Sequence, residues 1–127
     1  MNFSNCERPT DLPNCNNVYG LVVMDGPLAE LGNRLSSFRD GMEISHKKSQ
    51  FDGAESFRMG NVDCEFTCSL YRGNEYLLNG GVAGDNDYVS LFAKHLQEQL
   101  TQWGYASTFD VLDTHRKRIA WFGKPLD

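Results

Sequence analysis

The sequence predicts a single two-layer α+β domain, with two helices packed on one face of a mostly antiparallel sheet of about five to six strands. Its 127 residues are enough for one core of ordinary size. Short apolar stretches with strand-like alternation flank two segments with helical spacing. Short turns join most of these segments, which favours antiparallel neighbours. We therefore expect the element order β-α-β-β-β-α-β-β.

The beginning of the chain differs in character from the rest. Residues 1–16 hold Pro9 and Pro13 and have no periodic apolar pattern, which indicates an irregular N-terminal arm before a single domain over residues 17–127. The first strand is predicted over residues 17–24, where apolar residues occupy both alternating faces. This pattern is typical of a central strand that is covered on both sides or nearly so.

The first helix is predicted directly after this strand. Asp25 is a candidate N-cap and Pro27 suits the first turn. Four apolar residues then follow at spacings of 3, 4 and 3, and Gly41 ends the pattern. Beyond it we expect a short strand over residues 42–46 and a long polar loop over residues 47–60.

The second half of the chain predicts two hairpins separated by a long helix. A strand over residues 61–71 turns tightly into a returning strand over residues 76–79. An apolar stripe at helical spacing marks a helix over residues 88–103. Residues 105–112 and 118–122 then form the second hairpin.

The four cysteines give no sign of a disulfide pair on the sheet or of a metal site. Cys64 and Cys68 lie four residues apart on one predicted strand, roughly 13 Å between Cα atoms, whereas a disulfide allows about 7 Å. Both fall on the same strand face as Phe66, so we expect them to be small core residues. Neither this spacing nor that of Cys6 and Cys15 matches a zinc knuckle. We expect no metal and no cofactor.

Charge and hydropathy narrow the classes of partner. Seventeen acidic and twelve basic residues give a net charge of −5, which repels phosphate backbones and makes nucleic acid an unfavourable partner. The same charge favours a basic partner, although solubility alone would also explain it. The longest strictly aliphatic run has four residues, far below a membrane span, and the first residues lack a secretory pattern. We expect no membrane association and a cytoplasmic location.

The glycine-rich residues 79–84 raise the question of catalysis. They lie between a strand and a helix N-terminus, where backbone N–H groups can hold a phosphate. No Lys-Ser or Lys-Thr pair follows, and Asp85 and Asp87 place negative charge there, so helix capping is the expected role. Whether the chain is an enzyme stays uncertain, with no predicted catalytic residue. If it is one, Asp85, Asp87 and His95 are the candidates.

A protein-binding role is the function predicted from these observations. Residues 115–118 form the most concentrated basic segment and lie at a predicted hairpin tip. The opposite character, acidic and aromatic, is expected on the exposed sheet face. The predicted partner-binding residues are Glu65, Tyr71, Glu75, Asp110, Asp113, His115 and Arg116.

The class that best matches this size and charge is an immunity-type or other inhibitory protein, which neutralises a basic partner such as a bacterial toxin domain. The match is one of class, because no motif identifies a family. The alternative is a small ligand-binding or catalytic α+β domain. The chain is expected to be a monomer or a homodimer, and a terminal strand over residues 118–122 can pair across a two-fold axis.

Overall fold

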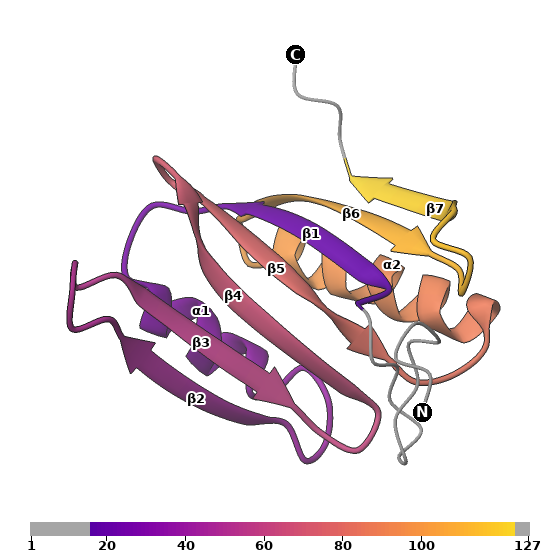
Figure 1. The fold of residues 1–127 in the computed structure, drawn as a ribbon, viewed down its shortest axis with the longest axis horizontal. Helices are drawn as coiled ribbons and strands as arrows, with labels where there is room; N and C mark the ends of the chain where they lie inside the picture. Colours follow the sequence, from indigo (N-terminus) through magenta and orange to yellow (C-terminus); the bar gives the residue numbers. More distant parts are fainter. Residues whose placement is uncertain (1–15, 124–127) are drawn as a thin grey trace.

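A computed structural model of the protein describes residues 16–123, which form one seven-stranded antiparallel sheet with two helices behind it (Figure 1). The elements in chain order are β1 (Val18–Val23), α1 (Leu28–Leu35), β2 (Glu43–Lys48), β3 (Glu55–Gly60), β4 (Cys64–Arg72), β5 (Glu75–Val82), α2 (Asn86–Gln102), β6 (Ala106–Leu112) and β7 (Arg118–Gly123). The strands lie in the order β2-β3-β4-β5-β1-β6-β7. The predicted two-layer α+β fold is confirmed, with slightly more strands than expected.

The additional strand is β3, which lies within the predicted polar loop over residues 47–60. It pairs with both β2 and β4 and buries Phe57 and Met59, while Arg58 between them is exposed. Two apolar residues form only one period of strand alternation. Among the surrounding charged and glycine residues, so short a pattern predicts a loop.

The two helices begin in different ways. Asp85 caps α2 as predicted, because its Oδ1 accepts a hydrogen bond from the backbone N–H of Tyr88 at 2.8 Å. The predicted cap of α1 is wrong: Asp25 instead accepts a hydrogen bond from the side-chain amide of Asn74 at 3.2 Å, and Pro27 precedes the first helical residue. Helix α1 is also shorter than predicted and ends at Leu35.

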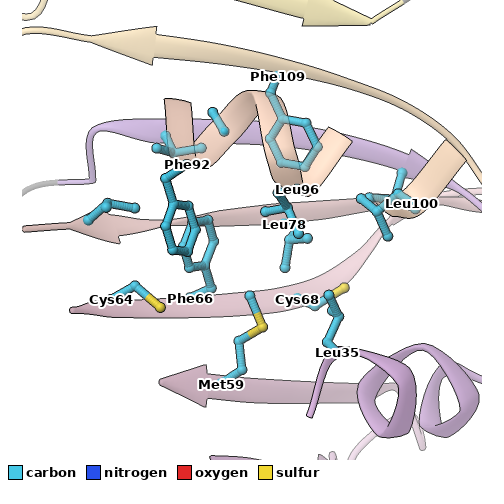
Figure 2. Close-up of a cluster of buried hydrophobic side chains, with 14 of the residues drawn as sticks. Leu35, Met59, Cys64, Phe66, Cys68, Leu78, Phe92, Leu96, Leu100 and Phe109 are labelled. Carbon is cyan, nitrogen blue, oxygen red and sulfur yellow. The ribbon is translucent and has the colours of Figure 1, made fainter. Parts of the chain in front are cut away.

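The core lies between the sheet and the helices. Helix α1 packs on β2 and β3, and α2 packs on β6 and β7. Between them the ring of Phe92 stacks on Phe66 at 6.0 Å and meets the edge of Phe38 at 5.5 Å. Figure 2 shows Cys64 and Cys68 in the same layer. Both thiols are free and buried, as predicted, and burial raises their pKa values to about 11 and about 12.

Two glycines explain why the central strands pack closely. A Cβ atom on Gly20 would lie 2.2 Å from the Phe109 ring, and one on Gly80 would lie 2.4 Å from the Phe66 ring. Each ring therefore occupies the space above a glycine on the neighbouring strand. Gly80 belongs to β5, which extends to Val82, so the stretch read as a possible phosphate loop begins as buried strand.

Other expectations concern the N-terminal arm and the membrane. The arm predicted over residues 1–16 lies outside the described residues except for Asn16, and so do Cys6 and Cys15. Over residues 16–123, neither helix is both long and apolar enough to cross a membrane.

Candidate binding surface

One face of the sheet is left open by the helices. In Figure 1 this face points toward the viewer, and both helices lie behind it. Burial alternates along β1, so that Val18 and Val22 are fully buried while Tyr19, Leu21 and Val23 are only half-buried on the open face. Within residues 16–123, the expected cover on both sides of this strand is therefore present only on the helix side.

The open-face residues of β1 continue onto β5. Leu77 lies directly opposite Leu21 in the antiparallel register and is also half-buried. Tyr19, Leu21, Val23 and Leu77 together form what we call the apolar strip. Thr67 and Ser69 of β4 border β5 on the same face, and both are exposed. The open face thus has the apolar strip at its centre and polar residues at its margin, which is a common composition for a protein-binding surface.

A large aromatic side chain lies near the other margin of the open face. Trp121 of β7 is 41% exposed and pairs with Asp110 of β6, whose other neighbour is Tyr19 of the apolar strip. Tryptophan carries a large share of the binding energy at many protein interfaces. The place of Trp121 on an edge strand, which leaves the ring accessible, is visible only once the strand order is known.

The predicted acidic residues of the sheet face are held in ion pairs. Glu65 lies 3.1 Å from Arg58, Glu75 lies 2.6 Å from Arg72, and Asp110 lies 3.1 Å from Arg118. All three arginines are well exposed. The open face consequently carries alternating charges of both signs around the apolar strip, where the sequence suggested a predominantly acidic face.

The turn between β6 and β7 is organised by Asp113. Its Oδ1 accepts hydrogen bonds from the backbone N–H groups of His115, at 2.8 Å, and Lys117, at 3.0 Å. The N–H of Lys117, followed by that of His115, stabilises the charged carboxylate and lowers the pKa of Asp113. This side chain therefore has a structural role in the turn.

Arg116 connects the same turn to the apolar strip. Its backbone has φ 66°, in the left-handed region that non-glycine residues rarely adopt. Its guanidinium donates hydrogen bonds to the Tyr19 hydroxyl and the Asn16 carbonyl, and lies 5.5 Å from the centre of the Tyr19 ring. The predicted basic hairpin tip is thus folded back, in part, onto one end of the apolar strip.

The seven residues predicted to bind a partner do not form one cluster. Glu75 lies opposite Val23 at one end of β1, with Tyr71 in the adjacent irregular end of β4. The others lie toward the opposite end of the sheet, where Asp110 pairs with Tyr19 and the β6–β7 turn follows. Glu65 is also at that end, opposite Gly81. The apolar strip lies between the two groups.

The residues considered for catalysis are not brought together. Asp85 caps α2 and Asp87 lies in its first turn, whereas His95 is about 15 Å farther along the helix axis than Asp85. His95 Nδ1 is 3.4 Å from a guanidinium nitrogen of Arg39. In the described part of the chain, no group of three or more His, Cys, Asp or Glu side chains is arranged to hold a metal ion.

A shallow hollow of about 570 Å³ lies beside β2, β3 and β4. Its lining includes the Arg58–Glu65 ion pair, Ser45, Lys47 and the exposed Val62. The volume is within the range of small-molecule sites, but these sites are typically enclosed and mainly apolar. The hollow is open and is bordered by charged side chains.

Comparisons of the chain with protein-family models, with curated proteins and with solved structures found no match.

Sequence reasoning identified charged residues around the surface but missed its apolar centre. The sequence feature that could have revealed this apolar centre is the run over residues 17–24, which is apolar on both strand faces. It was interpreted as a strand with two covered faces, because the number of layers cannot be read from a single strand. An uncovered second face is the other interpretation of the same pattern, and the placement of both helices selects it.

Proposed function

We propose that this protein is a protein-binding module and that the open face of its sheet, centred on the apolar strip, is the binding surface. The observation that carries this proposal is the alternation along β1, which places Leu21 and Val23 on a face that no described element covers. Half-buried apolar side chains with a polar margin gain most from a partner that removes the remaining water. The nearby Trp121 adds an accessible aromatic anchor.

The partner we propose is a basic protein that the module inhibits by stoichiometric binding, as an immunity-type protein neutralises a toxin domain. The net charge of −5 supports this choice, because long-range attraction raises the rate at which a basic partner is met. The apolar strip supplies affinity once contact is made. A cytoplasmic location belongs to the same proposal and is compatible with the free thiols of Cys64 and Cys68.

The alternative function, a small ligand-binding or catalytic domain, has the hollow beside β2, β3 and β4 in its favour. The hollow is lined by Glu43 and Glu65 as well as by Lys47 and Arg58, so a ligand bound there would be a polar molecule with groups that match both signs of charge. The two proposals predict different thermal-shift results. A protein binder is stabilised by its partner, whereas a ligand-binding domain is stabilised by a member of a library of polar small molecules.

The first test is a pull-down of the tagged full-length chain from a lysate of its native host, with light scattering of the eluted complex. We expect a stoichiometric complex with a basic protein. Recovery of the chain alone, together with a thermal shift caused by a polar small molecule, would contradict the proposal and favour the alternative.

The second test separates the role of charge from that of the apolar strip. Neutralising the three paired carboxylates, by Glu65→Gln, Glu75→Gln and Asp110→Asn, should slow association with the recovered partner by about tenfold at low salt. The effect should shrink as salt is added, because screening removes long-range attraction. An unchanged association rate at low salt would show that these carboxylates take no part in recognition.

A further inference from the structure

The two outer strands of the sheet differ in chemistry. Strands β2 and β7 end the strand order, so within residues 16–123 no strand pairs with the outer backbone edge of either. An open edge offers unpaired N–H and C=O groups to another chain. Strand β2 carries the exposed Lys47 and Lys48, and lysines on an edge strand oppose pairing with a second copy.

Strand β7 carries no lysine, and its irregularity is a register shift against β6 at Ile119, between the pairs Val111–Ala120 and Leu112–Arg118. The residues from Ile119 to Gly123 are uncharged and include no proline. Ile119 and Trp121 are 40% and 41% exposed. The one charge of the strand, on Arg118, is paired with Asp110 at 3.1 Å. The backbone edge of β7 is therefore bordered by apolar side chains and by a neutral ion pair.

We propose that β7 is an interface between two copies of this chain, in which the two β7 strands pair antiparallel across a two-fold axis. The result is one continuous sheet with twice the seven strands that residues 16–123 form in one chain. A two-fold axis through an antiparallel strand pair is perpendicular to the sheet, so both open faces lie on the same side and all four helices on the other.

A second copy suits this edge because the strand is compatible with itself. With the axis at Ala120, Ile119 lies opposite Trp121 of the second copy, and an aliphatic side chain opposite an aromatic one stabilises a strand pair. No acidic side chain of β7 meets its own copy in this register. This matters because each chain carries a net charge of −5, so two copies repel one another except where such a neutral contact is available.

The inference does not depend on the proposed function. The dimer uses the outer backbone edge of β7 with Ile119 and Trp121, whereas the proposed binding surface is centred on β1 and β5 and shares only Trp121 with the dimer interface. The two proposals are compatible, because joining the sheets at β7 leaves both apolar strips on the same uncovered side. The failure of either proposal leaves the other standing.

Sedimentation equilibrium of the full-length chain, from about 1 μM to about 1 mM, tests the interface. We expect the mass to rise toward twice the 14.4 kDa of one chain. Ile119→Lys, which places a charge beside its own copy, should weaken the dimer by at least about tenfold. The matched control is Ser45→Lys, which adds the same charge to β2, the other edge strand, and should leave the dimer unchanged.

Hydrogen exchange of the unsubstituted protein provides a measurement that no folding defect can affect. We expect the β7 amides to become more protected as concentration rises, with no change in β2. A constant mass of 14.4 kDa would overturn the proposal, as would a dimer that Ser45→Lys disrupts and Ile119→Lys does not. If the outer-edge amides of β7 are already fully protected in the monomer, the chain itself covers that edge, and the proposal is again overturned.

Discussion

At the residue scale, Asn17 acts as an extra backbone unit at the start of the central strand. Its side-chain amide donates to the Val82 carbonyl at 2.9 Å, and its Oδ1 accepts from the Val82 N–H at 2.9 Å. Its own backbone N–H donates to the carbonyl of Gly80 at 3.0 Å. The carboxamide thus extends the ladder between β1 and β5 by one further pair of hydrogen bonds.

Replacing this side chain should have a measurable cost. We expect Asn17→Ala to lower the free energy of unfolding by about 2 kcal/mol, because it leaves a partly buried N–H and C=O of Val82 without their partners. Asn17→Asp keeps the acceptor and loses the donor, so its cost at neutral pH should be smaller. Urea denaturation measures both, and a cost below about 0.5 kcal/mol for Asn17→Ala would show that water replaces the carboxamide.

The pH dependence of the β6–β7 turn should follow Asp113. The pKa of this carboxyl is lower in the folded chain than its ordinary value of 3.8, because the N–H groups of Lys117 and His115 bind the charged form. A lowered pKa in the folded state means that the carboxylate stabilises the turn fully above pH 3.8 and loses this effect as pH falls through the folded-state pKa. Amide resonances of His115 and Lys117 should therefore titrate with a midpoint below 3.8. They should lose this titration in Asp113→Asn, and a midpoint above 3.8 would contradict the assignment.

At the element scale, each of the two central glycines pairs with an aromatic ring on a neighbouring strand. Gly20 lies opposite Phe109, and Gly80 lies opposite Phe66. The rings fill the space that a side chain would take, which keeps the core filled above each glycine. Neither pair can be recognised from local sequence, because the partners are distant along the chain.

Enlarging Gly20 should therefore destabilise the sheet. We expect Gly20→Ala to lower the free energy of unfolding by about 2–4 kcal/mol, since its Cβ would lie 2.2 Å from the Phe109 ring. In a Phe109→Leu background the same substitution should cost at least about 1 kcal/mol less, because the smaller side chain can move aside. Equal costs in both backgrounds would show that the ring is not the cause.

Local patterns predicted some elements well and others poorly. Helix α2 and the hairpins β4–β5 and β6–β7 were identified because each combines a clear period with a turn or cap signal. Strand β3 was missed because only Phe57 and Met59 carry its alternation. The end of β5 was placed too early because Gly80 resembles a loop residue until the Phe66 ring is seen above it.

The candidate surface was predictable only where local alternation shows on which face of a strand a residue lies. The strand alternation placed Glu65 and Asp110 on the polar side of their strands, which the register confirms. The arginine partner of Glu65 is Arg58 on β3, a strand that the sequence pattern does not predict, whereas the partner of Asp110 is Arg118, across the predicted hairpin of β6 and β7. The apolar strip depends in turn on which face the helices cover.

At the scale of the whole molecule, the fold separates its two faces. One face of the sheet is sealed by α1, α2 and the aromatic core between them, while the other combines the apolar strip with balanced charge (Figure 1). The acidic excess of the chain is therefore a property of the molecule and is not concentrated at the proposed surface. We expect the total charge to affect how fast a partner arrives and the apolar strip to decide how long it stays.

The most direct test of this account is calorimetric titration of the recovered partner against two matched variants. Leu77→Lys places a charge in the apolar strip, and Leu91→Lys places the same charge on α2, where the leucine is 48% exposed. The account predicts that Leu77→Lys raises the Kd by about 100-fold or more and that Leu91→Lys changes it by less than about threefold. With both variants folded, as thermal unfolding would show, similar affinities for the two, or a loss confined to Leu91→Lys, would contradict it.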